Sequence, residues 1–300
     1  MTNHGGFQLN KLILAISILV GVLSQGFAAS ILIVNGDGQP EVAQDSTNVS
    51  ALETALGNTV TFAGTVPGGL GGYTAIFDLR FSDSTALTGA DVSAYDKYLI
   101  GGGSLYLMGE NGQFAQRNNS IFSFINGLGG GTFSFVPGCS GLAGDTQIQV
   151  AIAPFNGPGP VNGPGSTAIG ALYNCEGNFN NHGTGQFVTT VAPAQAMGKN
   201  GGSPFGAGIA FAPGTLPGAP GGRLVSVLDS DFMINVPLIA PGDARAIASQ
   251  NLVQNIVQYV NLGGIPPGSP GSAPVPEPAS MTLVAGAIGL GIFRKMRRHV

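Results

Sequence analysis

Short apolar runs that end in glycine-rich turns alternate along this sequence with segments of helical periodicity. Residues 31–34 run into the turn at 35–38, and residues 104–108 run into the turn at 109–112. Between them, residues 46–56 carry apolar side chains three and four positions apart, the spacing of one helix face. Buried strands that alternate with amphipathic helices are typical of a parallel sheet covered on both faces. We therefore predict an α/β fold with a mostly parallel sheet.

The same pattern gives the order of elements in the body of the chain, residues 29–262. We predict strands over 31–34, 59–63, 73–79, 104–108, 132–136 and 223–228, and helices over 46–56, 91–99, within 114–128 and over 251–262. Ser46 or Thr47 should cap the first helix. Residues from about 137 to 222 are rich in Gly, Pro and Asn. We expect an irregular, partly β insertion there, with short β-like runs at 147–152 and 186–191.

Composition excludes several classes of protein. The 300 residues are 43% hydrophobic and only 9% charged, which is too apolar for an ordinary disordered chain. The formal net charge of −4 argues against a nucleic-acid partner. The sequence has neither GxGxxG spacing after the first strand nor a Walker GK[ST] motif. We therefore expect no nucleotide cofactor.

The N-terminus, residues 1–28, has the features of a secretory signal peptide. Lys11 precedes an apolar run at 12–23, and the small residues Gly26 and Ala28 follow it. This is the order of basic region, apolar helix and cleavage site that the secretion translocon and signal peptidase recognise. We expect cleavage after Ala28, so that the exported chain begins at Ala29. The alternative is an uncleaved anchor helix, for which the run is short.

The C-terminus, residues 275–300, carries three features in order. They are the motif Pro276, Glu277 and Pro278, a short apolar run at 281–293, and the basic residues Arg294, Lys295, Arg297 and Arg298. Residues 263–274 before it form a Gly/Pro-rich linker.

This arrangement resembles the PEP-CTERM sorting signal of Gram-negative bacteria that make exopolysaccharide. The resemblance implies an exosortase as partner and delivery to the cell surface or extracellular matrix. The precursor would first be held in the inner membrane by a short transmembrane helix, with the basic residues as a stop on the inner side. A plain single-span anchor is the alternative, and whether the tail is cleaved stays open.

The body resembles the class I glutamine amidotransferase-like fold, which has a flavodoxin-type sheet. The likeness rests on residues 31–38 (ILIVNGDG), 102–112 (GGSLYLMGENG) and 222–235 (GRLVSVLDSDFMIN). More narrowly, the body resembles the non-enzymatic members found in bacterial surface and gliding proteins. Enzymes of the family need a Cys on the turn after the middle strand, with a His and a Glu. The matching turn, 108–112, has no Cys, Ser or Thr, so we do not expect the enzymatic activity.

Two cysteines, Cys139 and Cys175, lie in the predicted insertion. In an exported, loop-rich chain, a pair of cysteines indicates a disulfide. It would close a loop of about 36 residues and stabilise the fold by roughly 3–4 kcal/mol. The alternative is a nucleophilic Cys175 beside His182, but nothing in the sequence would orient that histidine.

Polar residues, most of them acidic, gather where the predicted strands end. Asp37 follows the first strand, Glu110 and Asn111 follow the middle one, and Asp229 and Asp231 follow the late one. Because α/β proteins bind ligands at the carboxyl ends of their strands, these residues mark a candidate ligand cleft. The alternative is that they shape turns and cap helices. A full calcium-loop pattern is missing, so we predict no metal site.

These observations favour a non-catalytic exported protein of the cell surface or extracellular matrix, with exopolysaccharide as a candidate partner. Two alternatives stay open. One is an extracellular glycan or ester hydrolase that uses the strand-end carboxylates as acid and base. The other is a module that binds polysaccharide or Ca²⁺.

Overall fold

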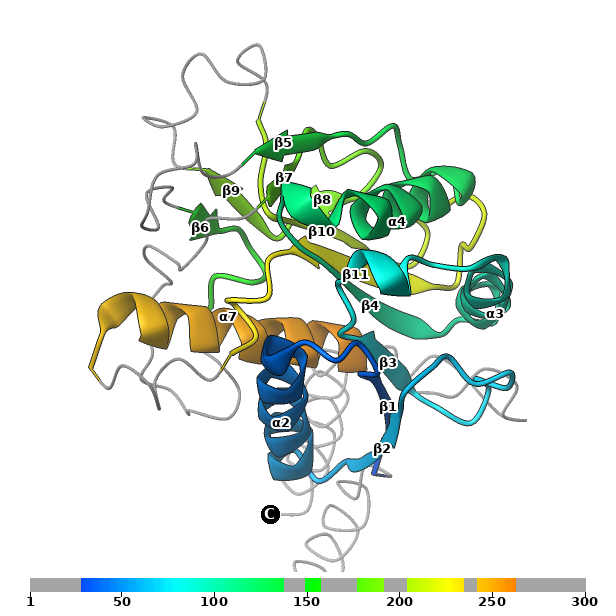
Figure 1. Cartoon of the computed structure of the whole chain (residues 1–300), viewed down its shortest axis with the longest axis horizontal. Helices are drawn as coiled ribbons and strands as arrows, with labels where there is room; N and C mark the ends of the chain where they lie inside the picture. Colours follow the sequence, from blue (N-terminus) through cyan, green and yellow to red (C-terminus); the bar gives the residue numbers. More distant parts are fainter. Residues whose placement is uncertain (1–27, 138–148, 158–176, 192–203, 235–241, 263–300) are drawn as a thin grey trace, which may run out of the picture. The chain divides into compact units, whose positions relative to one another are not determined.

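The computed structural model describes residues 28–137, 149–157, 177–191, 204–234 and 242–262. A seven-stranded sheet forms its centre (Figure 1). The strands lie in the order β2 (Thr59–Ala63), β1 (Ser30–Val34), β3 (Ala75–Asp78), β4 (Ser104–Gly109), β11 (Arg223–Leu228), β10 (Gly208–Phe211) and β8 (Gln186–Phe187). Neighbours from β2 to β11 are parallel, whereas β10 runs antiparallel to both β11 and β8. The predicted α/β class with a mostly parallel sheet is confirmed.

The five parallel strands follow a doubly wound order. Numbered along the chain, they lie as 2-1-3-4-5, one of the common orders of such sheets. The connection from β1 to β2 crosses one face and the connection from β3 to β4 crosses the other, so the winding reverses between β1 and β3. In doubly wound sheets this switch point is the usual place for a ligand.

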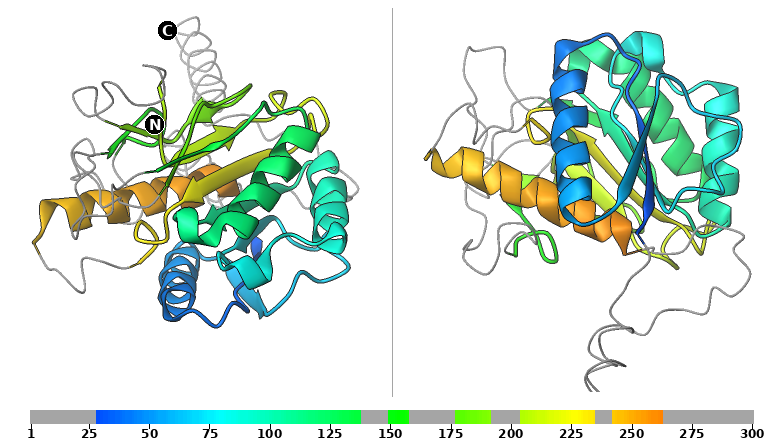
Figure 2. Two further views of the ribbon diagram at one scale, coloured as in Figure 1. Left: turned by 45° about the horizontal axis from the view of Figure 1, so that its top comes forward. Right: turned by 90° about the horizontal axis from the view of Figure 1, so that it is seen from below.

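Helices cover both faces of the sheet (Figure 2). α2 (Pro40–Ala55) and α7 (Ala244–Asn261) pack on one face, and α3 (Gly89–Ile100) and α4 (Ala115–Gly127) pack on the other. Side chains alternate along a strand. Ile31 and Ile33 therefore belong to the core under α2 and α7, whereas Leu32 and Val34 belong to the core under α3 and α4. Burial on both faces explains why this strand is a continuous apolar run.

Two helices begin six and seven residues before their predicted starts at 46 and 251. α2 starts at Pro40, with Gln39 as its N-cap, so neither Ser46 nor Thr47 caps it. Proline suits the first helical position because its missing N–H would have no partner there. α7 starts at Ala244 because the side chain of Asp243 accepts hydrogen bonds from the next backbone N–H groups.

The strand predicted over 132–136 does not join the central sheet. The chain instead forms β5 (Phe135–Pro137), which pairs antiparallel with β7 (Gly177–Phe179) in a separate two-stranded sheet. β11 occupies the place beside β4. The chain also leaves α4 through Gly129 and Gly131, whose positive φ angles turn it away from the parallel strands.

Part of the predicted insertion belongs to the central sheet. β10 and β8 extend that sheet beyond β11, so the predicted irregular, partly β insertion over about 137–222 also contributes strands to the central sheet. β10 was missed because its sequence, GIAF, is short and lies among Gly and Pro residues, yet all four residues are buried. β6 (Gln149–Ala151) and β9 (Thr189–Val191) form a further antiparallel pair. The β-like runs predicted at 147–152 and 186–191 are thus strands in their described parts.

Several predictions concern residues that the structure does not describe. The signal segment up to residue 27, the linker from 263 and the whole sorting signal to residue 300 lie outside the described residues, as do Cys139 and Cys175. These predictions stay untested. Among the helices of the described ranges, none is both long and apolar enough to cross a membrane.

Candidate functional site at the carboxyl edge of the sheet

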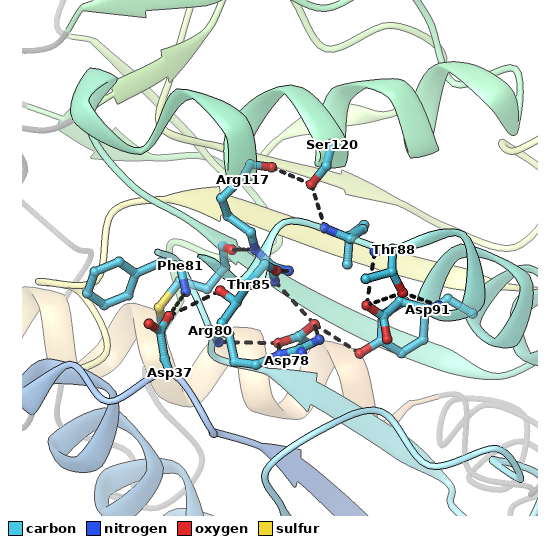
Figure 3. A network of polar contacts seen from close by, with 12 residues as sticks. Asp37, Asp78, Arg80, Phe81, Thr85, Thr88, Asp91, Arg117 and Ser120 are labelled. Atoms are coloured by element: carbon cyan, nitrogen blue, oxygen red, sulfur yellow. Dashed lines mark hydrogen bonds and ion pairs between the residues drawn. The ribbon is translucent and has the colours of Figure 1, made fainter. Parts of the chain in front are cut away.

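Two groups of charged residues lie at the carboxyl edge, separated by the sheet. The first is on the face covered by α3 and α4 and centres on Asp78, the last residue of β3 (Figure 3). The second is on the face covered by α2 and α7 and centres on Glu110, directly after β4. Alternation along the strands fixes this division: Ile76 lies in the α3/α4 core, whereas Tyr106 and Met108 lie in the α2/α7 core.

Asp78 is fully buried and carries an ion-pair network (Figure 3). Both of its carboxylate oxygens accept from Arg80, with Nε and Nη2 at 2.8 Å each. Arg117 of α4 places its Nη2 3.2 Å from Oδ2, and the Tyr95 hydroxyl of α3 donates to the same oxygen at 2.9 Å. Burial alone would raise the pKa of Asp78. Arg117, Arg80 and Tyr95 together outweigh burial, so the pKa lies below its usual range.

Arg117 also links α4 to the loop that follows β3. Its Nη1 donates to the carbonyl of Thr85 at 2.8 Å, and its Nε donates to the carbonyl of Met108 at 3.1 Å. In return, the Asp83 carboxylate accepts from the backbone N–H groups of Gln116 and Arg117 at the start of α4, at 2.7 and 3.1 Å. Ser120 accepts from the backbone N–H of Leu87 at 2.9 Å. These contacts give Arg117 a structural role.

Asp37 lies at the switch point, but its carboxylate already binds backbone N–H groups of the chain itself. Its Oδ2 accepts from the backbone N–H groups of Phe81 and Ser82, the latter at 2.8 Å, and from the Thr85 hydroxyl at 3.3 Å (Figure 3). The other oxygen has no hydrogen-bond partner among the described residues. Asp37 therefore joins the loops after β1 and β3 where a doubly wound protein would hold its ligand.

The second group contains the other predicted acidic residues. Glu110 Oε1 accepts from the backbone N–H of Asn111 at 3.0 Å, and Oε2 accepts from that of Ser230 at 2.9 Å. Asp229 accepts from the backbone N–H of Asp231 at 2.8 Å. The Glu110 carboxylate thereby joins the loops after β4 and β11. The predicted set is thus divided, with Asp37 in the first group and Glu110, Asp229 and Asp231 in the second.

Asn111, the remaining predicted residue, has a local role. Its side chain accepts from the backbone N–H of Gln113 at 2.8 Å and caps the 3-10 turn η2 (Gly112–Phe114). His182, which the sequence offered as a partner of Cys175, stands edge-on against Phe187 with ring centroids 5.2 Å apart. Cys175 lies outside the described residues.

Asp45 of α2 was not predicted as a site residue from the sequence. Its side chain is fully buried, and neither carboxylate oxygen has a hydrogen-bond partner among the described residues. Burial is the main reason that its pKa is raised well above the usual value, and the negative charges of Glu110, Asp231 and Glu41 add to it. The signal was available: Asp45 stands on the same helical stripe as Val42, Val49 and Leu52, which all face the core.

Tyr106 of β4 is the second unpartnered group on this face. It is fully buried, and its hydroxyl has no partner within the described part of the chain. Burial raises its pKa well above the usual value, as do the charges of Asp45, Asp229 and Glu110. The negative charges of Asp45, Glu110 and Asp229 therefore act on the phenol of Tyr106 within this second group.

The chemistry open to these residues is limited by burial. Asp45 and Asp229 are 0% exposed and Glu110 is 3% exposed, so a substrate cannot reach them without rearrangement. At the end of β4, a Cβ on Gly109 would come within 2.5 Å of the Leu228 side chain and 2.6 Å of that of Asn118, so this position has no room for a larger residue. No set of three or more His, Cys, Asp or Glu within the described ranges is arranged to hold a metal ion. The carboxylates of Glu110 and Asp229 accept hydrogen bonds from backbone N–H groups.

Comparisons with known proteins bear on the fold alone. No protein-family model matches the chain, and no curated protein matches it. Among solved structures, it is similar to one described as "mmIFT52 N-terminal domain", with 11% sequence identity and a TM-score of 0.51. The match covers 77% of this chain and 97% of that chain. At this identity the likeness concerns the α/β architecture.

Proposed function

We propose that this chain is a non-catalytic exported protein of the cell surface or extracellular matrix. Its body is a scaffold of the flavodoxin type, as the strand order 2-1-3-4-5 suggests. Its C-terminal residues 275–300 act as a sorting signal that an exosortase recognises. Signal peptidase removes residues 1–28, and a short helix over 281–293 holds the precursor in the inner membrane.

One observation carries the non-catalytic part of the proposal: the carboxyl edge of the sheet is closed by its own residues. Asp37 and Glu110 bind backbone N–H groups of neighbouring loops, and Asp78 is bound by two arginines. A general acid or base must reach its substrate within hydrogen-bond distance. Buried carboxylates that already serve the backbone favour the alternative in which strand-end acids shape turns, and they argue against a two-carboxylate hydrolase.

The delivery part of the proposal rests on the sequence of the tail, and one substitution tests it. Pro276 and Pro278 keep the motif extended, so a membrane enzyme can read the carboxylate of Glu277 between them. We expect Glu277→Ala to accumulate in the inner membrane with its tail attached. Ser272→Ala, in the neighbouring linker, is the control and should be processed like wild type. Membrane fractionation with intact-mass measurement decides, and normal placement of the Glu277→Ala protein would refute the sorting proposal.

A further inference from the structure

The strand β2 lies at the edge of the central sheet and turns one side away from β1. β2 ends the seven-stranded sheet and, among the described residues, pairs with β1 alone. Three of its five residues are exposed, and Phe62 exposes 51% of its surface. In Figure 1 the strand lies at one border of the sheet.

Hydrogen bonds to β1 establish which backbone groups face outward. Thr59 donates its N–H to the carbonyl of Ala29 at 2.8 Å, and Ala63 accepts from Asn35 at 3.0 Å. Alternate residues of a strand present their backbone groups to the same side. Thr59, Thr61 and Ala63 therefore face β1. The N–H and C=O groups of Val60 and Phe62 face away from it, and no strand within the described ranges pairs with these four groups.

Two common protections of an edge strand, charged side chains and prolines, are missing from the sequence of β2. Natural proteins block free edges with charged side chains, prolines or very short strands. Residues 54–77, which include β2 and its flanks, contain no Asp, Glu, Lys or Arg. No proline lies within the strand itself. The opposite edge differs, because β8 is only two residues long. A chain of net charge −4 meets its own copy with least repulsion across such a neutral segment.

We propose that two copies of this chain pair their β2 strands in antiparallel fashion about a two-fold axis at Thr61. In this register Val60 lies opposite Phe62 of the second copy, and Thr61 lies opposite Thr61. All four outward backbone groups of each copy then find partners, because Val60 and Phe62 form hydrogen-bonded pairs. On one face an aromatic ring meets a β-branched side chain, and on the other two threonines meet, both favourable cross-strand pairs. The two central sheets become one continuous sheet.

Cysteine substitution tests the register. Thr61 sits in a non-hydrogen-bonded pair, in which the two Cα atoms lie about 4.5 Å apart, a separation that a disulfide bridges. Thr59 lies four residues from its own counterpart, about 13 Å away. The full protein isolated from the producing cell, as Thr61→Cys, should form a covalent dimer on mild oxidation. The matched Thr59→Cys protein should form no covalent dimer. Both variants retain Cys139 and Cys175, so any crosslinking through these two cysteines is the same in both.

Sedimentation equilibrium provides the second readout. The wild-type protein should show the mass of a dimer, whereas Thr61→Lys, which sets two ammonium groups face to face, should shift it to a monomer. Ser93→Lys adds the same charge on the exposed surface of α3 and should stay dimeric. A monomeric wild type overturns the proposal. So does equal crosslinking of Thr59→Cys and Thr61→Cys, or capture of a different protein by Thr61→Cys.

Discussion

Asp78 and Asp45 are both buried carboxyls at the same edge of the sheet, but their surroundings have opposite effects. Asp78 faces Arg80 and Arg117 on the α3/α4 side, and its pKa is lowered. Asp45 faces Glu110 and Asp231 on the α2/α7 side, and its pKa is raised. The charge of Asp78 therefore stabilises the fold, whereas the charge of Asp45 destabilises it.

Replacing Asp78 with Asn should lower the free energy of unfolding by about 3–5 kcal/mol at neutral pH. The substitution leaves Arg80 and Arg117 buried without a counter-charge, which is the costly way to break a buried pair. Urea denaturation measures the loss, and Asp96→Asn, a half-buried site on α3, should change stability by less than about 0.5 kcal/mol. In wild type the contribution is present above the unfolded pKa of Asp and is lost as the pH falls through the lowered native value. Equal stability of both variants would contradict the role of this network.

Asp45→Asn should change the pH dependence of stability in the opposite sense. Between the unfolded value of 3.8 and the raised native pKa, folded wild type holds a proton that the unfolded chain has released. Wild-type stability therefore falls as the pH rises through this window, by up to about 1.4 kcal/mol per pH unit. The variant lacks this slope and should gain stability over wild type toward neutral pH. Unfolding measured from pH 4 to 8 tests this, and parallel curves would show that Asp45 does not carry the effect.

Among the elements, α3 has a complete capping box, and its loss should be measurable. The Thr88 side chain accepts from the backbone N–H of Asp91 at 3.2 Å, and the Asp91 side chain accepts from that of Thr88 at 3.0 Å. Thr88→Ala should lower the free energy of unfolding by about 1 kcal/mol. Ser93→Ala, on the exposed face of the same helix, should cost nothing comparable. Thermal unfolding compares the two, and equal melting temperatures would rule out the cap as a source of stability.

How well each element could be predicted depends on whether its signal is local. β1 and β4 are buried on both faces, so their apolar runs identify them without further information. β10 is equally buried but gains its partners from distant β11 and β8, and glycines around it hide the pattern. In the candidate site, too, only residues with a local signal could be predicted. Glu110, Asp229 and Asp231 were found because they end strands, whereas the pairing of Asp78 with Arg117 depends on contacts across the fold.

At the scale of the whole molecule, the sequence and the structure support different parts of the proposal. In the α/β body, the carboxylates at the carboxyl edge of the sheet are buried. Its fold is similar to that of a solved domain at 11% identity, and a likeness of fold does not imply a shared function. The ends of the chain, residues 1–27 and 263–300, lie outside the described residues. Their role as export and sorting signals rests on residue order alone. Export is therefore the part of the proposal most in need of a direct test.

Locating the wild-type protein in the producing cell and sequencing its N-terminus is that test. If the body is an exported surface protein, it should be found outside the cytoplasm with Ala29 as its first residue, because Gly26 and Ala28 form the cleavage site before β1. A form that lacks residues 275–300 should be exported and cleaved equally but fail to stay with the cell envelope. Wild-type protein that begins at Met1 and stays in the cytoplasm would contradict the proposed function.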